Sequence, residues 1–485
     1  MMHEHLGALA GLTRELSDQF QKAGSSLYLV GGGVRDSIVR RNQVLDGDLD
    51  FTTDAVPDEI ERIVAGWADE VWLQGKRFGT VGCARAGRKY EITTHRKEVY
   101  SPDSRKPAVA FGDSVEEDLA RRDFTVNAMA LRLPDFLLID PFGGTDDLAA
   151  GRLRTPLEPE VAFGEDPLRM MRAARFIAGY GLEPDPSLTK AVESGHSRLS
   201  IVSAERLRDE LDKLLLVEDP TKGLWFLVDT GLAGEILPEI PALALEQDPL
   251  HRHKDVLAHT IAVVSNAQPD RILRLAALFH DIGKPRTRAF TPTGVSFHHH
   301  DLVGARMARG RMRALKYSND DIEDVSRLVE LHLRFHTYRM GWTDRAVRRY
   351  VRDAGPLLER LNELTRCDCT TRNPARARAL GLRMDELEQR IAELAEREEL
   401  DSIRADLDGN QVMERLNIPP GSLVGEALAF LMELRLDEGP LGAQEAGRRL
   451  DEWWASRGAS SPSAAAGSGG SRRPVEYSED DSRSL

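Results

Sequence analysis

The segment spanning residues 27–51 constrains the fold of this chain more than any other. Its apolar run at residues 27–30 predicts a short buried strand. Three glycines follow, and because glycine has no Cβ, their backbone N–H groups can approach a ligand closely. A helix is expected over residues 34–40. A strand, a glycine turn and a helix N-terminus in this order indicate a site for a polyphosphate.

A pair of aspartates follows this turn. Asp48 and Asp50 alternate with Leu49 and Phe51, so a strand would place both carboxylates on one face. Carboxylates are hard oxygen ligands for Mg²⁺. Two such ions can activate an attacking hydroxyl and stabilise a leaving pyrophosphate. Asp46 offers a competing pair with Asp48, but the alternating apolar residues favour Asp48 and Asp50.

Composition limits the classes of protein to consider. A chain of 485 residues with 41% apolar residues should form several domains with cores of their own. Three cysteines exclude a disulfide framework and suit a reducing cytoplasm. Neither a signal peptide nor an apolar run of about 18 residues is visible, so no membrane span is expected. The net charge of −14 argues against a general nucleic-acid coat protein, although a local basic surface could still bind RNA.

Several motifs resemble those of one family. The glycine turn and aspartate pair together resemble the nucleotidyltransferase fold of the DNA polymerase β superfamily. The string GGGVRD followed by DLDF is similar to the class II tRNA nucleotidyltransferase and poly(A) polymerase family, with a slightly longer spacing before Asp48. RRDFTVNAMA at residues 121–130 resembles the second motif of this family, and EDPLRMMRAARF at residues 165–176 resembles its templating motif.

The resemblance implies roles for individual residues. The catalytic carboxylates would be Asp48, Asp50 and Glu91, although the pattern around Glu91 also fits a surface glutamate. Arg105 lies in a Pro- and Ser-rich stretch, residues 100–112, that is expected to be a loop able to close over substrate. The implied nucleotide-binding residues are Gly31, Gly32, Gly33, Arg35, Arg105, Arg122, Asp123, Asn127, Asp166, Arg169, Arg172 and Arg175.

Within the templating motif, Asp166 and Arg169 are three residues apart and are expected to meet on one helix face. A carboxylate accepts a hydrogen bond from an exocyclic amine, and a guanidinium donates to ring acceptors. Cytosine and adenine present both groups, whereas uracil and guanine present a carbonyl in place of the amine. Such a pair would accept CTP and ATP and reject UTP and GTP. The spacing alone favours a structural ion pair between Asp166 and Arg169. The family resemblance favours a role of this pair in base selection. Residues 203–211 are expected to form a helix that braces this one.

Residues 251–370 carry a second constellation of histidines and aspartates. An adjacent His280-Asp281 pair on an apolar helix is followed by Gly283-Lys284, and such ligands suit a transition metal or Mg²⁺. The pattern resembles an HD-family phosphohydrolase domain. The resemblance implies metal ligands at His259, His280, Asp281 and Asp368, with His300 and His332 completing a two-metal site. Metal-bound water there could hydrolyse phosphoesters, although a retained scaffold without activity is also open.

These observations predict an α+β protein. A polymerase-β-type mixed sheet with helices is expected over residues 1–150, a helical nucleotide-selecting neck over 151–245 and an HD domain over 246–370. A helical RNA-binding tail over 371–455, with a long helix at 375–400, precedes a disordered segment at 456–485. The arginine clusters at residues 306–313 and 345–352 fit either a solvated helix face or an RNA contact.

The resemblance implies template-independent addition of CMP and AMP from CTP and ATP to the tRNA 3′ end, with Mg²⁺, in the cytoplasm and without an obligate protein partner. Poly(A) polymerase and partial CC-adding or A-adding enzymes remain open. An alternative of another class is an HD phosphohydrolase whose N-terminal domain only binds RNA.

Overall fold

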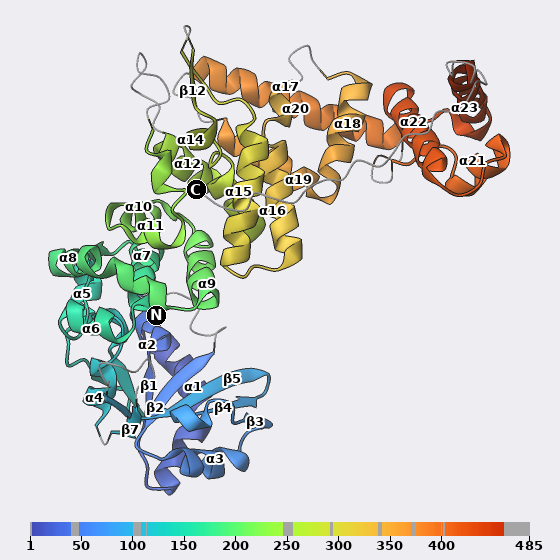
Figure 1. Ribbon diagram of the computed structural model, residues 1–485. Coiled ribbons are helices and arrows are strands. Elements are labelled where there is room, and N and C mark those ends of the chain that lie inside the picture. The colour runs from blue at the N-terminus through green and yellow to red at the C-terminus, as the bar shows by residue number, and fades with distance from the viewer. Residues whose placement is uncertain are drawn as a thin grey trace, which may run out of the picture. The chain divides into compact units, whose positions relative to one another are not determined.

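The fold of the protein was analysed in a computed structural model (Figure 1). It describes residues 2–39, 48–99, 108–112, 114–245, 256–291, 294–337, 342–369, 374–398, 400 and 403–459. The chain divides into two compact units, Met1–Arg339 with Ala354–Asp385, and Met340–Asp353 with Glu386–Leu485. The expected α+β class is confirmed, because a mixed sheet near the N-terminus is followed mainly by helices. No helix within the described ranges is long and apolar enough to cross a membrane.

The N-terminal sheet has seven strands in the order β3-β4-β5-β2-β1-β8-β9. These strands are β1 (Leu27–Val30), β2 (Leu49–Thr53), β3 (Glu70–Trp72), β4 (Thr80–Arg85), β5 (Arg88–Thr94), β8 (Ala130–Leu133) and β9 (Leu137–Ile139). β2 and β5 are parallel, whereas the other neighbours pair antiparallel. Leu49 and Phe51 of β2 are buried and Asp50 between them is exposed, as the alternation of the sequence predicts. The central strands therefore present a carboxylate away from the core.

Helices pack on this sheet and enclose its core. They include α1 (Met2–Lys22), α2 (Gly32–Ile38), α3 (Pro57–Ala65), α4 (Val115–Ala120) and α5 (Gly144–Ala150). Leu16 and Phe20 of α1 and Ile60 of α3 are buried with Leu29 and Phe51 in one apolar cluster. Burial of these side chains removes apolar surface from water and anchors the strands that carry the aspartates.

The helix expected from Val34 is confirmed as α2, which begins two residues earlier, at Gly32, because only Gly31 takes up the turn, with φ of +69°. The loop prediction for residues 100–112 is wrong for β7 (Ala108–Phe111), which pairs antiparallel with β6 (Arg96–Val99), while residues 100–107 lie outside the described residues. The stretch from Ala108 carries no proline or serine and includes Val109 and Phe111, residues that favour strands.

A helical region follows the sheet. It comprises α6 (Pro159–Glu165), α7 (Leu168–Tyr180), α8 (Pro186–Gly195), α9 (Ala204–Leu215), α10 (Thr221–Asp229) and α11 (Leu232–Ile236). Helix α10 crosses α7 closely, because a Cβ placed on Gly223 would lie 2.5 Å from the carbonyl oxygen of Ala174. The glycine is thus required for this packing.

The following helices hold the histidines. They are α12 (Val256–Asn266), α13 (Arg271–Phe279), α14 (Lys284–Thr287), α15 (His300–Ala314), α16 (Asn319–Leu331), α17 (Arg334–Thr337) and α19 (Leu358–Asp368), with the strands β12 (Ala289–Thr291) and β13 (Gly294–Ser296) between α14 and α15. A Cβ on Gly283 would lie 2.1 Å from the carbonyl oxygen of His300. This close approach seats the start of α15 against the segment that follows His280.

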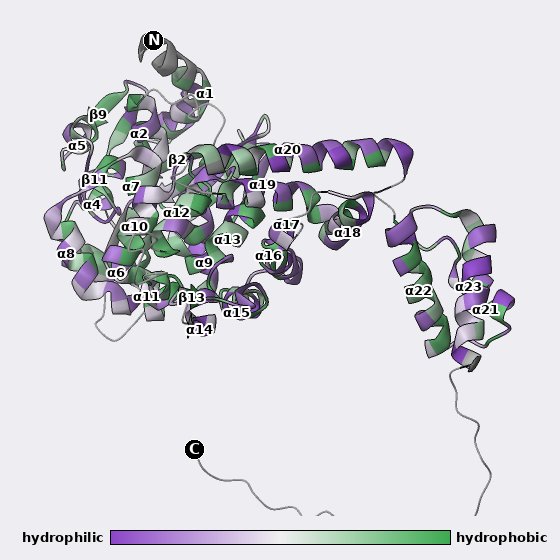
Figure 2. Cartoon of the chain, turned by 90° about the horizontal axis from the view of Figure 1, so that it is seen from above, coloured by the Kyte–Doolittle hydropathy of each residue, from purple (hydrophilic) through white to green (hydrophobic). Residues whose placement is uncertain are grey.

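The helix expected over residues 375–400 is confirmed as α20 (Pro374–Arg397), which is predominantly hydrophilic in Figure 2. In the second unit, α21 (Gly409–Leu416), α22 (Ser422–Glu438) and α23 (Gly442–Ala459) enclose a small core of their own. Asp408 caps α21 in a reciprocal pair of hydrogen bonds with Gln411. The disorder predicted from residue 456 is wrong for residues 456–459, which continue α23, while 460–485 lie outside the described residues.

Candidate active site and metal centre

Three predicted carboxylates gather at the centre of the sheet. The parallel register of β2 and β5 places Asp50 opposite Glu91, and Asp48 immediately precedes β2. Loss of hydration and the charges of Glu91 and Asp48 raise the pKa of Asp50 from 3.8 to about 6, against the opposing charge of Arg122. Clustered carboxylates of this kind repel one another, and a divalent cation would relieve that repulsion.

The glycine turn lies directly against these carboxylates. A Cβ on Gly31 would lie 3.2 Å from Arg122 Nη1 and 3.6 Å from Asp50 Oδ2. Gly31 also has φ of +69°, which disfavours any other residue. Arg122 is held by Asp118, whose Oδ2 lies 3.3 Å from Arg122 Nη2. The structure therefore assembles a turn, a guanidinium and three carboxylates in one place.

Other residues predicted to bind nucleotide form hydrogen bonds with one another. Arg35 donates from Nη1 to Asn127 Oδ1 at 2.5 Å and stacks over the ring of Tyr180. Asn127 donates to Asp123 Oδ1 at 2.9 Å, and Arg172 donates to Asp123 Oδ2. Burial alone would raise the pKa of Asp123, but the charge and hydrogen bonds of Arg172 and the bond from Asn127 lower it below its ordinary value. These contacts link the sheet domain to α7, because Arg172 and Tyr180 belong to α7 and their partners do not.

Helix α9 braces α7 through ion pairs, as expected. Arg175 Nε lies 2.9 Å from Glu210 Oε2, and Arg172 Nη1 lies 3.7 Å from Glu210 Oε1. Lys213 lies 3.1 Å from the same carboxylate. Glu210 is buried, and although burial opposes its charge, Arg175 and Arg172 lower its pKa.

The prediction that Asp166 and Arg169 meet on one helix face is wrong. Asp166 lies between α6 and α7 with an extended backbone, φ −135° and ψ 99°. Its Oδ2 lies 2.8 Å from Arg206 Nη2, and its Oδ1 accepts from the backbone of Leu168. Pro167 explains the break, since a residue that precedes proline is disfavoured in helical conformation.

Arg169 is correspondingly occupied elsewhere. Its Nη1 donates to the carbonyl of Ala162 at 3.0 Å and to Glu165 Oε2 at 3.2 Å. Its Nη2 donates to the carbonyl of Arg121. Arg169 is buried and thus links the templating segment to the second motif. Of the remaining predicted sites, Arg105 lies outside the described residues, as does Asp46.

The six predicted HD ligands come together in two neighbouring groups. One group is His259, His280 and Asp368, and the other is Asp281, His300 and His332, with the ligand atoms of each group within 4.8 Å of one another. His259 Nε2 lies 2.9 Å from Asp368 Oδ1 and 3.3 Å from His280 Nε2. His300 Nε2 lies 3.4 Å from Asp281 Oδ1. His259, His300 and Asp368 belong to α12, α15 and α19, whereas His280 and Asp281 directly follow α13 and His332 directly follows α16. The ends of these helices thus meet at one point.

Three of these histidines are oriented in the same way. The Nδ1 atoms of His280, His300 and His332 each lie 2.6–2.7 Å from the carbonyl oxygen three residues earlier in the chain. A carbonyl only accepts, so Nδ1 carries the proton and Nε2 of the neutral ring carries a lone pair. This is the arrangement by which backbone carbonyls orient metal-binding imidazoles.

The electrostatics of the cluster also fit a metal. Among the described residues, the buried Nε2 atoms of His300 and His332 have no hydrogen-bond partner. Burial and the charge of His280 lower the pKa of His332 from 6.5 to about 4, so its ring is neutral at pH 7. His280 and Lys284 lower the pKa of Asp281 well below its ordinary value despite burial. The donor set of imidazoles and carboxylates fits a divalent metal ion.

Some residues at these sites were not identified as site residues from the sequence. Lys284 Nζ lies 2.5 Å from Asp281 Oδ2, and Arg206 holds the carboxylate of Asp166. The sequence offered a signal for Lys284, since it follows the His-Asp pair within the same short motif. Arg206 offered none, because its partner lies 40 residues earlier.

Three family models match consecutive parts of the chain. The poly A polymerase head domain matches residues 27–154, and the model described as a probable RNA and SrmB-binding site of polymerase A matches residues 181–243. The HD domain matches residues 256–401. The matches cover the sheet domain and the helical region as well as the histidine cluster.

Two curated relatives are similar to this chain in sequence. The A-adding tRNA nucleotidyltransferase of Deinococcus radiodurans is 35% identical over 357 residues, which are 70% of this chain and 80% of the relative. The CCA-adding enzyme of Bacillus subtilis is 41% identical over 216 residues, 44% of this chain and about half, 52%, of that relative.

Solved structures share the fold. The Bacillus stearothermophilus CCA-adding enzyme in complex with CTP matches with a TM-score of 0.70 and 25% identity, covering 94% of this chain and 99% of that one. The Thermotoga maritima CCA-adding enzyme complexed with tRNA, at 18% identity and a TM-score of 0.56, covers 92% of this chain and 95% of that one and shows the same fold. Enzymes of the nucleotidyltransferase and HD families generally use divalent metals. The resemblance seen in the sequence is confirmed, and the chain belongs to the class II tRNA nucleotidyltransferase and poly(A) polymerase family.

Proposed function

We propose that this protein adds CMP and AMP, from CTP and ATP, to the 3′ end of tRNA without a nucleic-acid template. The observation that carries the proposal is the grouping of Asp48 and Glu91 around Asp50, whose carboxylate lies beside the glycine turn at Gly31. The substrates are supported by the relatives, which are named A-adding and CCA-adding enzymes. The protein would act in the cytoplasm, where tRNA matures, and no obligate protein partner is proposed.

The carboxylates would hold Mg²⁺ ions, because they form a cluster of hard oxygen donors whose mutual repulsion a cation offsets. Such ions, when bound, lower the pKa of an attacking hydroxyl and neutralise charge on a leaving pyrophosphate. Arg122 lies beside Asp50 and the turn and would contact the triphosphate. Gly31 leaves room for the phosphates to approach the backbone. The attacking 3′-hydroxyl comes from the RNA, so the chain needs no nucleophile of its own.

Asp166 would read the base. Arg206 and the Leu168 backbone fix its carboxylate at the junction of α6 and α7, and a carboxylate accepts from the amine of cytosine or adenine. Arg169 uses three N–H bonds on Ala162, Glu165 and Arg121, whereas a guanidinium has five. Its remaining donors would bind the ring acceptor. Uracil and guanine would place a carbonyl oxygen opposite the Asp166 carboxylate. Both groups only accept hydrogen bonds, so these bases would be rejected.

The HD cluster would bind one or two divalent ions, through His259, His280 and Asp368 and through Asp281, His300 and His332. The oriented Nε2 atoms of His300 and His332 support this assignment, and among the described residues the buried Nε2 of His332 has no hydrogen-bond partner. A metal there supplies an activated water for phosphoester hydrolysis. The protein would then carry a phosphodiesterase or phosphatase activity beside its transferase activity.

An A-adding enzyme is the second candidate, because the relative matched over 80% of its length carries that name. Purified protein with Mg²⁺ and tRNA transcripts ending before CCA, after the first C and after CC would separate the two. Extension of all transcripts by CTP and ATP supports CCA addition. Extension of the CC-ended transcript alone, by ATP, supports A addition.

A further inference from the structure

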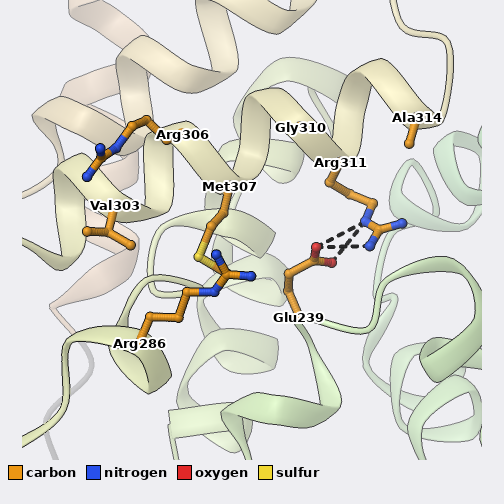
Figure 3. A pocket seen from close by; sticks show the side chains of 8 residues that line it. All are labelled: Glu239, Arg286, Val303, Arg306, Met307, Gly310, Arg311 and Ala314. Atoms are coloured by element: carbon orange, nitrogen blue, oxygen red, sulfur yellow. Dashed lines mark hydrogen bonds and ion pairs between the residues drawn. The ribbon is translucent and has the colours of Figure 1, made fainter. Parts of the chain in front are cut away.

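A cavity of about 580 Å³ lies in the first unit outside both sites described above (Figure 3). It is open to solvent and is lined by α14, α15 and the turn that precedes the short helix η5 (Pro241–Leu243). The side chains that matter are those of Glu239, Arg286, Val303, Arg306, Met307 and Arg311. The size is that of a site for a small molecule.

The cavity carries unbalanced positive charge. Its one acid, Glu239, is engaged by Arg311 in a fork, with Nε 2.9 Å from Oε2 and Nη2 2.9 Å from Oε1. Arg286 and Arg306 are exposed, and neither forms an ion pair with any residue that the structure describes. In Figure 3, the guanidinium of Arg286 lies beside Met307 and faces Glu239, whereas the side chain of Arg306 points away from these residues at the margin. The guanidinium of Arg286 is therefore available to an anion in the cavity, and Arg306, an exposed side chain at its margin, would have to turn inward to reach the same anion.

The cavity adjoins the HD cluster along α15. His300, Val303, Met307 and Arg311 recur at helical spacing and share one face of that helix. At a rise of about 1.5 Å per residue, Val303 lies about 4.5 Å and Met307 about 10 Å beyond His300 along the axis. Arg286 follows the segment that contains Asp281 and Gly283. One end of the cavity therefore lies about one helical turn from a candidate metal ligand.

We propose that this cavity binds a small phosphate-bearing molecule, either a nucleoside phosphate or pyrophosphate, with Arg286 and Arg306 on the phosphate groups. Guanidinium forks match phosphate oxygens and bind them in pairs. Val303 and Met307 offer an apolar wall against which a base or ribose can pack. The Arg311–Glu239 ion pair fixes the opposite wall. This site is separate from the carboxylate cluster, and the inference stands without the proposed transferase function.

Isothermal titration of the full-length protein with ADP and, separately, pyrophosphate tests the inference. The variants are Arg286→Ala and Arg306→Ala, and the matched control is Arg313→Ala, an exposed arginine of α15 that does not line the cavity. Arg286→Ala and Arg306→Ala should each raise the dissociation constant of ADP and of pyrophosphate at one class of sites at least about tenfold. Arg313→Ala should bind both ligands like the wild type. Tighter binding of ADP than of pyrophosphate would identify a nucleoside phosphate, and equal binding would identify the phosphate groups alone as the ligand.

Identical isotherms for the wild type and all three variants would overturn the inference. Hydrogen exchange gives a second readout that does not require a variant, because ADP should protect residues 303–314. Unchanged exchange there at saturating ADP and pyrophosphate would also overturn it. tRNA extension should be retained in every variant, so a failure of the cavity proposal and a failure of the transferase proposal are distinguishable.

Discussion

Arg172 donates both Nε and Nη2 to a single carboxylate oxygen, Asp123 Oδ2, at 2.8 and 2.5 Å. The two residues are 49 positions apart, and the bond joins the segment after α4 to α7. Asp123 is buried and Arg172 is about a third exposed (32%), so salt screens the pair less than it would screen a fully exposed pair. Two residues predicted to touch nucleotide thus first serve to hold two regions of the fold together.

This pair predicts a pH-dependent loss of stability. The pKa of Asp123 is lowered in the folded state, so its stabilisation is present above the ordinary value of 3.8 and is lost as the pH falls. Asp123→Asn should lower the free energy of unfolding by about 3 kcal/mol at pH 7 and by less as the pH approaches 3. Urea unfolding across that range measures the difference. The exposed control Asp146→Asn should change stability little at either pH, and a pH-independent loss in Asp123→Asn would contradict the assignment.

The carboxylate cluster predicts a loss of activity without a loss of fold. Asp50→Ala should reduce nucleotide transfer at least about a thousandfold, because a metal ligand at the reacting phosphate is removed. The melting temperature should not fall, since Asp50 is exposed and its charge is opposed by Glu91 and Asp48. Glu70→Ala, an exposed glutamate on β3 of the same sheet, should retain full activity. Retained transfer in Asp50→Ala would place the reaction elsewhere.

Asp166→Ala and Arg169→Ala should differ in their effects on the stability of the fold. Asp166→Ala should lower discrimination of CTP over UTP at least about tenfold and change stability by less than about 1 kcal/mol, because its ion pair with Arg206 is partly exposed to solvent. Arg169→Ala should lower the free energy of unfolding by about 1–3 kcal/mol, because it removes a buried side chain that donates to the carbonyls of Ala162 and Arg121. Incorporation ratios and urea unfolding measure the two effects. Equal discrimination in Asp166→Ala and wild type would remove Asp166 from base reading.

We expect the HD cluster to bind metal independently of nucleotide transfer to tRNA. His280→Ala and His332→Ala should each lower the divalent metal retained after gel filtration, measured by elemental analysis, because each removes an oriented Nε2. The exposed His298→Ala serves as the control and should retain wild-type metal. tRNA extension should be unchanged in all three. Wild-type metal content in both cluster variants would show that these residues do not bind it.

The local pattern of apolar and polar residues predicted the strands and helices described next, including those beside the carboxylate cluster. The apolar run before Gly31, the alternation around Asp50 and the periodicity of α20 each correspond to an observed element. The neighbour relation of Asp50 and Glu91 follows from a parallel pairing of β2 and β5, which alternation within one strand does not specify. Family resemblance, and not spacing, pointed to Glu91.

The sequence could not give the partners of the charged residues. Asp166 bonds Arg206 across 40 residues, and Asp123 bonds Arg172 across 49, because tertiary packing decides which cations reach a buried carboxylate. One error had a visible local cause. Pro167 disfavours a helical Asp166, and that signal outweighs the three-residue spacing to Arg169.

The most direct test of the central claim is extension of a tRNA that lacks its last three nucleotides. The purified full-length protein is incubated with this tRNA, Mg²⁺ and each nucleoside triphosphate singly and in pairs, and the products are sized and sequenced. CTP alone should add two cytidines, and CTP with ATP should add CCA and then stop. A long adenosine ladder would indicate a poly(A) polymerase. No extension by the wild type on this or on a CC-ended tRNA, indistinguishable from Asp50→Ala, would contradict the transferase assignment and shift attention to His280 and Asp281.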